Sequence, residues 1–305
     1  MLNVRKRGSL SGHAQPVYAL ASAQHSHHII SAGGDRWIAL WNLQTMQSEN
    51  AIAQATSTVY ALCFIPGFNY LVIGEASGSI HFIDLVKYQS VRNIQYHQHP
   101  VFYLKYHAST ERLFASTAAG CISVWNVNNG KLIHELKITA DKIRSMDFHE
   151  SNNLFVAGAS DNKVYVFELD TLQPLHSFEA HPWATNVVRF HPSLNLLFSA
   201  SRDAHIRSWD IENWQLYENI PAHHFAIYRM DFSPCHQWMA SASRDKTIKL
   251  WDIRNGINFL KRIDKENNVG HTHSVNDVLW HSTENLIISC GDDKQVIVWE
   301  VNEEN

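Results

Sequence analysis

The 305-residue chain has no run of eighteen apolar residues, so nothing in the sequence indicates a segment that spans a membrane. It has only four cysteines and no C-x-x-C pair; they are Cys63, Cys121, Cys235 and Cys290. Scattered cysteines of this kind are typical of small core or strand residues in a reducing compartment, so we expect a cytoplasmic protein. The formal net charge is only −4, which gives no whole-protein electrostatic reason to bind nucleic acid or an anionic membrane.

Sequence motifs of catalysis are missing as well. The chain has no Gly-rich phosphate loop, no G-x-S-x-G and no H-E-x-x-H. It also lacks long segments with a 3.6-residue apolar period, which would indicate helices. We therefore expect neither an enzyme nor a bound cofactor.

What the sequence does contain is an internal period. A large hydrophobic residue recurs at Trp41, Ile83, Trp125, Phe167, Trp209, Trp251 and Trp299. The first six are 42 residues apart, whereas the last follows after 48. The six extra residues lie in the polar stretch 261–269, where we expect a longer surface loop.

Each period holds four short segments with the alternation of strands, separated by turn residues. In the sixth period these segments are 226–232, 238–243, 247–251 and 258–262. A repeated unit of four strands and about forty residues is typical of a propeller blade.

Two polar markers keep the same register. A histidine stands four residues before the first strand of most periods, at His13, His97, His181, His223 and His271. An aspartate stands six residues before the closing hydrophobic residue, at Asp35, Asp161, Asp203, Asp245 and Asp293.

This pattern resembles the WD-repeat (Trp-Asp repeat) β-propeller family. The paired residues that carry the resemblance are Gly12-His13, Gly270-His271, Trp209-Asp210 and Trp251-Asp252. The resemblance implies an all-β fold, a single seven-bladed β-propeller of four-stranded antiparallel blades over residues 1–305. The blades are expected near 13–53, 54–95, 96–137, 138–179, 180–221, 222–263 and 270–302, and the N-terminal strand 4–10 is expected to complete the last blade.

The resemblance also implies a structural hydrogen-bond network inside a blade, made of His, Ser, Asp and Trp. Carried over by register, the four complete sets are His13, Ser31, Asp35, Trp41; His181, Ser199, Asp203, Trp209; His223, Ser241, Asp245, Trp251; and His271, Ser289, Asp293, Trp299. A catalytic Ser–His–Asp triad is the competing interpretation, but it needs an exposed nucleophile. Four copies that each end in a tryptophan N–H favour the structural role.

Blades two to four lack parts of this network. The register places Ala55, Ile73, Ser77 and Ile83 in blade two; Ala115 and Ala119 in blade three; and Thr139, Ala157 and Phe167 in blade four. We therefore expect these three blades to be the least rigidly held.

Twenty histidines raise the question of a metal site. Four of them follow the first strand of their period and would be spread around a rim: His107, His149, His191 and His281. His25, His27 and His28 cluster locally, but no Cys or carboxylate stands beside them at ligand spacing. We interpret these histidines as solvated turn residues and expect no metal.

A partner is expected on the face of the propeller where the first strands begin. The residue after the first position of these strands should face the channel, and aromatic or cationic residues occur there at Tyr18, Tyr60, Phe102, Arg144 and Tyr228. Register places four further residues nearby on blades five and six: Trp183, Arg202, Phe225 and Arg244. Aromatic residues and arginine are enriched in binding hot spots, and arginine also recognises carboxylates and phosphates. The alternative for the aromatic residues is that they only close the channel.

These observations predict a non-catalytic scaffold, monomeric by itself, that binds a protein or peptide segment with acidic groups beside an apolar anchor. A nucleic-acid-associated adaptor is the alternative, because arginine and aromatic side chains also bind single strands. The slightly negative charge and the absence of a basic stripe speak against it. A propeller enzyme ranks below both, since the seven channel-facing positions hold no Asp or Glu.

Overall fold

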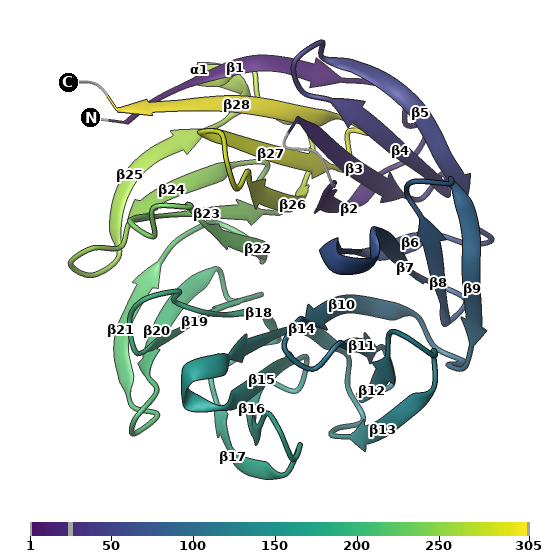
Figure 1. The fold of residues 1–305 in the computed structure, drawn as a ribbon. Coiled ribbons are helices and arrows are strands. Elements are labelled where there is room, and N and C mark those ends of the chain that lie inside the picture. The colour runs from purple at the N-terminus through teal and green to yellow at the C-terminus, as the bar shows by residue number, and fades with distance from the viewer. Residues whose placement is uncertain (1, 24–26, 304–305) are drawn as a thin grey trace.

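The protein is a closed ring of seven four-stranded antiparallel sheets, and all but a few of its regular elements are strands (Figure 1). The structure, a computed structural model, describes residues 2–23 and 27–303. The seven four-stranded sheets confirm the fold class and the number of blades that the sequence predicted. The first strand of each blade lies around the central channel and the fourth lies at the rim (Figure 1).

The blades follow one another along the chain, and their strands run from the channel outward. Blade one consists of β2 (Val17–Ser22), β3 (His28–Gly33), β4 (Trp37–Asn42) and β5 (Gln47–Gln54). Blade two consists of β6 (Val59–Ile65), β7 (Tyr70–Glu75), β8 (Ser79–Asp84) and β9 (Gln89–Gln95). Blade three consists of β10 (Val101–His107), β11 (Arg112–Thr117), β12 (Cys121–Asn126) and β13 (Leu132–Lys137). Blade four consists of β14 (Ile143–His149), β15 (Leu154–Ala159), β16 (Lys163–Glu168) and β17 (Pro174–Glu179).

The remaining blades repeat this order, except that the last one borrows its outer strand. Blade five consists of β18 (Thr185–Phe190), β19 (Leu196–Ser201), β20 (His205–Asp210) and β21 (Leu216–Pro221). Blade six consists of β22 (Ile227–Phe232), β23 (Trp238–Ser243), β24 (Ile248–Asp252) and β25 (Asn258–Ile263). Blade seven consists of β26 (Val275–Trp280), β27 (Leu286–Gly291), β28 (Val296–Glu303) and the N-terminal strand β1 (Leu2–Leu10).

Strand β1 closes the ring, as the sequence predicted. It pairs antiparallel with β28 along its length, from Leu2 opposite Glu303 to Leu10 opposite Val296. Its side chains Val4 and Leu10 are buried. Because β1 covers the outer edge of β28, the first and last strands of the chain lie side by side (Figure 1).

The hydrophobic core is divided among the seven interfaces between neighbouring blades. Within the described residues there are seven clusters of buried apolar side chains, each built from two adjacent blades. The cluster between blades seven and one joins Leu10, Ile288 and Val298 to Val17 and Trp41. No blade buries its two faces alone, so the ring is stable only as a closed set.

Within the described residues, short helical turns occur in three of the connections between strands. The polar stretch after blade six contains a helical turn, α1 (Lys265–Asn268), because the Asp264 side chain accepts a hydrogen bond from the Asn267 N–H and caps it. Single 3₁₀ turns also occur at Pro66–Phe68 and Glu150–Asn152, where the sequence showed no helical period.

The interpretation of the rim histidines as solvated turn residues is wrong for His107, His191 and His281, which are buried. The Nδ1 atom of His191 accepts hydrogen bonds from the N–H groups of Ser193 and Leu194, so the ring closes the turn after β18. Its ring also meets Phe232 of the next blade nearly edge-on, at 5.3 Å between centroids. The local histidine cluster divides: His27 contacts Glu284 and His28 contacts Glu49, whereas His25 lies outside the described residues.

Candidate functional site

The His, Ser, Asp and Trp side chains that the repeat predicts do meet inside blades one, five, six and seven. In blade six, the Ser241 Oγ lies 2.7 Å from His223 Nε2 and 2.8 Å from Trp251 Nε1. The other ring nitrogen, His223 Nδ1, lies 2.9 Å from Asp245 Oδ2. The same contacts join His13, Ser31, Asp35 and Trp41; His181, Ser199, Asp203 and Trp209; and His271, Ser289, Asp293 and Trp299. We call this set the blade network.

When the aspartate is ionised and the imidazole is neutral, the donors and acceptors of the blade network match in one arrangement of protons. The tryptophan N–H can only donate, so Ser241 Oγ accepts it and donates its own proton to His223 Nε2. The imidazole then carries its single proton on Nδ1 and donates it to Asp245. Burial lowers the pKa of His223, which keeps the ring neutral at pH 7. Burial alone would raise the pKa of Asp245, but hydrogen bonds from His223 and Thr247 hold it well below its usual range.

The blade network does not present a nucleophile to a substrate. The side chains of Ser31, Ser199, Ser241 and Ser289 are completely buried. Each serine oxygen is already occupied by a tryptophan and a histidine of its own blade. The geometry therefore resembles a catalytic triad only in its residue types.

Blade three replaces its missing serine from the neighbouring strand. Ala115 on β11 stands opposite Ser123 on β12, and the Ser123 Oγ lies 2.8 Å from His97 Nε2 and 2.7 Å from Trp125 Nε1. The hydroxyl therefore reaches the same two partners from the third strand instead of the second. Sequence register missed Ser123 because it compared equivalent positions along one strand and not pairs across strands.

Blade four rebuilds a different part of the network. The Thr139 Oγ1 donates to Asp161 Oδ2 at 2.7 Å, and the Tyr165 hydroxyl donates to the same oxygen. Burial and the hydrogen bond to Asp161 raise the pKa of Tyr165 to about 12, so its hydroxyl remains a donor at pH 7. Blade four thus keeps the aspartate but replaces the histidine by two hydroxyl groups.

Blade two has the apolar interior that its sequence indicates, with Ile73 and Ile83 buried. It also contains a buried carboxylate that the register did not single out. The Oε2 atom of Glu75 accepts hydrogen bonds from Thr56 Oγ1 at 2.6 Å and from the Ser57 N–H at 2.9 Å. These bonds connect the end of β7 to the segment that leads into β6, which is the connection that the histidine makes elsewhere.

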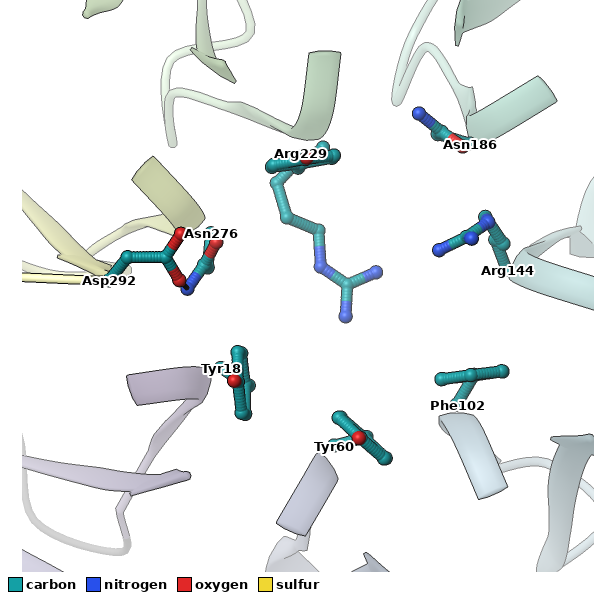
Figure 2. Close-up of a pocket in the computed structure, with 9 residues that line it drawn as sticks. Tyr18, Tyr60, Phe102, Arg144, Asn186, Arg229, Asn276 and Asp292 are labelled. Atoms are coloured by element: carbon teal, nitrogen blue, oxygen red, sulfur yellow. Dashed lines mark hydrogen bonds between the residues drawn. The ribbon is translucent and has the colours of Figure 1, made fainter. Parts of the chain in front are cut away.

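The channel-facing positions also come together, as the register predicted. They line a cavity of about 420 Å³, which we call the channel mouth; its lining residues are Tyr18, Tyr60, Phe102, Arg144, Asn186, Tyr228, Arg229, Asn276 and Asp292 (Figure 2). The ring centroids of Tyr18 and Tyr60 are 5.4 Å apart, and those of Tyr60 and Phe102 are 5.2 Å apart. The three rings therefore form a continuous aromatic wall on blades one to three.

The opposite side of the channel mouth is polar. The Asn186 and Asn276 side chains donate to the Ile227 and Val17 carbonyls of the following blades, so they join neighbouring blades. Asn276 also donates to Asp292 at 2.8 Å.

The four remaining predicted residues do not line the channel mouth but form two pairs on blades five and six. The guanidinium of Arg202 lies 5.8 Å from the ring centroid of Trp183, and that of Arg244 lies 6.0 Å from the ring centroid of Phe225. We call Trp183–Arg202 and Phe225–Arg244 the outer pairs. Trp183 and Phe225 are more than half exposed, at 58% and 57%, so both rings are open to a partner.

Below the channel mouth, the channel is lined by charged side chains that sequence reasoning missed. Ion pairs join Lys105 to Asp147 at 2.6 Å, Arg189 to Asp231 at 2.6 Å, and Arg229 to Asp277 at 3.2 Å. Each aspartate also accepts a backbone N–H from a neighbouring blade, as Asp147 does from Phe190. Burial raises the pKa of Asp231 and Asp277, and the paired arginines oppose this. The signal was present in the sequence as Lys105, Asp147, Arg189 and Asp231, one per blade at the same position.

Within residues 2–23 and 27–303, no group of three or more His, Cys, Asp or Glu side chains is placed to hold a metal ion. In the same part of the chain no helix has the length and apolar character needed to cross a bilayer.

The fold and the blade networks define a seven-bladed propeller of repeated units, and comparison with known families agrees. The profile of the family described as "WD domain, G-beta repeat" matches residues 5–42, 130–168, 172–210, 214–252 and 265–300. These segments make up more than half of the chain, so the protein belongs to the WD-repeat family. Propellers of this family generally serve as protein-interaction scaffolds.

Individual relatives add little beyond the fold. The WD repeat-containing protein YPL247C of Saccharomyces cerevisiae is 53% identical over 34 residues, which are 11% of this chain and only 6% of that protein. Among solved structures, the WD40 beta propeller domain of Doa1 superimposes with a TM-score of 0.86 over 100% of this chain and 98% of that one. The two sequences are 17% identical, so this likeness concerns the fold alone.

Proposed function

We propose that the protein is a non-catalytic interaction platform that binds a protein or peptide segment on the face carrying the channel mouth and the outer pairs. One observation supports this most directly. An exposed Trp or Phe ring lies beside an exposed arginine on two adjacent blades, and the equivalent positions of the other five blades hold no Phe, Tyr or Trp and no arginine. Paired aromatic and guanidinium groups of this kind suit an acidic segment with an apolar anchor.

The partner-binding surface comprises both groups of residues. The aromatic wall of Tyr18, Tyr60 and Phe102 would receive apolar side chains, and Arg144, Arg202 and Arg244 would contact acidic ones. Tyr228 lines the channel mouth on blade six and follows Phe225 of an outer pair by three residues in the chain. We also expect the protein to be monomeric by itself. Its scattered cysteines favour a reducing compartment such as the cytoplasm.

The test is capture of partners from a lysate by the immobilised protein, with the wild type compared with the double variant Arg202→Ala and Tyr228→Ala. We expect the double variant to lose the partner while its melting temperature stays within a degree or two, because Arg202 is exposed and Tyr228 is only half-buried. The matched control removes the same residue types away from this face. It combines Arg112→Ala, at the end of β11 remote from the channel mouth, with Tyr217→Ala on the exposed outer strand β21. Capture that survives the double variant would rule out this surface.

The nucleic-acid alternative separates from this proposal by its salt dependence. Contacts with phosphates release counterions, so such a complex would weaken steeply between low and moderate salt. A protein complex held mainly by the aromatic wall would weaken much less.

A further inference from the structure

The centre of the channel mouth is occupied by Arg229, which no repeat position predicted. It extends from β22 of blade six, and its guanidinium lies 4.6 Å from the ring centroid of Tyr103 of blade three. Figure 2 shows this guanidinium in the middle of the opening. Arg229 lines both the channel mouth and a smaller cavity of about 110 Å³ in the channel. Its side chain therefore forms the floor of the channel mouth.

Only one side of this guanidinium is paired. The Nε atom of Arg229 lies 3.2 Å from Asp277 Oδ1, which holds the side chain in place. Among the described residues, none accepts a hydrogen bond from its two terminal nitrogens, which point to the middle of the opening in Figure 2. A planar fork of donors in this orientation suits a carboxylate.

Arg144 adds a second cation on the wall of the same cavity. Its Nε donates to Ser160 Oγ at 3.2 Å, and its guanidinium lies 5.6 Å from the ring centroid of Phe102. No carboxylate within the described ranges lies within 4.0 Å of it. Burial, together with the nearby charge of Arg202, lowers the pKa of Arg144, because both disfavour its cationic form. An anion bound in the channel mouth would offset this cost.

The charge of the lining determines which anion fits. Arg144 and Arg229 carry two positive charges, and Asp292 carries one negative charge, which leaves one net positive charge (2 − 1). Asp277 lies below and already offsets part of the charge of Arg229. Among the lining residues alone, this balance suits one carboxylate better than a phosphate, which carries about two negative charges at pH 7. Arg202 and Lys142 lie near the lining, so inorganic phosphate is included below as a competing probe.

We propose that the channel mouth is a binding site for a single carboxylate, which enters between Arg144 and the terminal nitrogens of Arg229. The aromatic wall of Tyr18, Tyr60 and Phe102 then covers the apolar group that bears the carboxylate. This inference rests on the proposed function, because it identifies the part of a bound segment that the channel mouth receives. An Asp or Glu side chain or a free C-terminus supplies the same chemistry.

Small probes test the site without a known partner. We would titrate the protein with 3-phenylpropionate, with its neutral amide 3-phenylpropanamide, and with inorganic phosphate at low salt, and follow binding by NMR chemical shifts. We expect a saturable site for the carboxylate with a dissociation constant on the order of millimolar, as befits so small a ligand. The amide should bind about tenfold more weakly, since it loses the charge-assisted hydrogen bonds.

Variants assign the site to its residues. Arg144→Gln should weaken 3-phenylpropionate binding about tenfold, whereas the remote control Arg112→Gln should leave it unchanged. Arg229→Lys keeps a charge beside Asp277 but loses the planar fork, so it should also weaken the probe while the melting temperature reports that the ring is intact. Equal binding of acid and amide, unchanged binding in Arg144→Gln, or tighter binding of phosphate than of the carboxylate would each overturn the proposal.

The outcomes also separate this site from the proposed function. Loss of partner capture in the variant with Arg202→Ala and Tyr228→Ala, but normal capture in Arg144→Gln, would contradict the carboxylate site and leave the platform standing. Carboxylate binding that depends on Arg144, with capture unaffected by Arg202→Ala and Tyr228→Ala, would support the site and contradict the proposed surface.

Discussion

Blades five to seven and blade one hold their strands with identical side chains, whereas blades two to four reach a similar result with different ones. In blade six the shared hydroxyl comes from Ser241 on the second strand, and in blade three it comes from Ser123 on the third. Blade four uses Thr139 and Tyr165, and blade two uses a buried carboxylate. The comparison shows that the repeat preserves hydrogen-bonded connections between strands and tolerates changes in the residues that make them.

A second contrast concerns the face that we expect to bind. Blades one to three contribute aromatic rings to the channel mouth, and blades four to six contribute cations there and in the outer pairs. The blades with altered networks and those with complete networks both take part. The composition of a blade network therefore does not decide which blades carry the residues that we propose for binding.

The largest change in stability is expected from deleting β1, which tests whether a complete blade network is enough to keep a blade folded. Blade seven has its full network, but its outer strand β1 comes from the other end of the chain. Deleting residues 2–10 exposes the edge of β28 and removes the buried side chains of Val4 and Leu10, worth about 1.5–3 kcal/mol each. We expect the melting temperature to fall by about 10 °C or more. The exposed-residue control Asn3→Ala should melt like the wild type, and a deletion that melts within a degree or two of it would show that β1 is dispensable.

The second comparison tests whether Ser123 on the third strand of blade three stabilises its blade as much as Ser241 on the second strand of blade six. Ser241→Ala in blade six and Ser123→Ala in blade three each leave a tryptophan N–H and a histidine nitrogen unpaired, at about 1–3 kcal/mol per buried group. We therefore expect both variants to lose about 2–4 kcal/mol in urea unfolding. Combining Ser123→Ala with Ala115→Ser moves the hydroxyl back to β11 and should restore much of the loss. A harmless Ser123→Ala would mean that blade three does not depend on its network.

Acidification should affect both classes of blade through their histidines. Burial lowers the pKa of His97 in blade three and of His223 in blade six below the value of 6.5 expected in the unfolded chain. The unfolded state therefore binds protons first, and the free energy of unfolding falls as pH drops below about 6.5, by about 1.4 kcal/mol per pH unit for each such group. The contribution of Asp245, whose pKa is lowered, persists until pH falls through about 3.8 and below.

Urea unfolding at pH 7.5, 6.5 and 5.5 would measure this dependence. His97→Gln and His223→Gln should each flatten the curve, since each removes one titrating group. A wild-type stability that does not change across this range would contradict the neutral state of the histidines in the folded ring.

The smallest expected effect is a difference in amide hydrogen exchange between blade two and the other blades. The sequence alone predicts that blades two to four are the least rigidly held. In blades three and four, however, Ser123 and Asp161 form hydrogen bonds between strands, so we now expect weaker protection only in blade two. We expect amide hydrogens of β7 to exchange faster than those of β23, by no more than about tenfold. Equal protection of the two strands would mean that the apolar packing of Ile73 and Ile83 fully replaces the blade network.

Much of the molecule follows from the period. The spacing of the closing hydrophobic residues predicted seven blades, and in the sixth repeat the predicted strands 226–232 and 238–243 correspond to β22 (Ile227–Phe232) and β23 (Trp238–Ser243). It also brought the right residues to the channel mouth, because equivalent positions of a repeat must lie on one circle. The complete blade networks were found in the same way, whereas only the structure shows that Trp183 with Arg202 and Phe225 with Arg244 form two separate pairs.

The sequence by itself thus determined the ring, its closure by the first strand and the positions that repeat around it, because these depend on spacing along each strand. Only the tertiary structure decided which side chains make contact when they stand at non-equivalent positions of the repeat. Ser123 replaces Ala115 across a strand pair, and Arg229 reaches over the channel to Tyr103 on the far side. The histidines expected in solvent, such as His191, are buried because the next blade covers them. The period of the sequence specifies the strand and the position of each residue. The contacts of that residue depend on side chains from other strands and other blades.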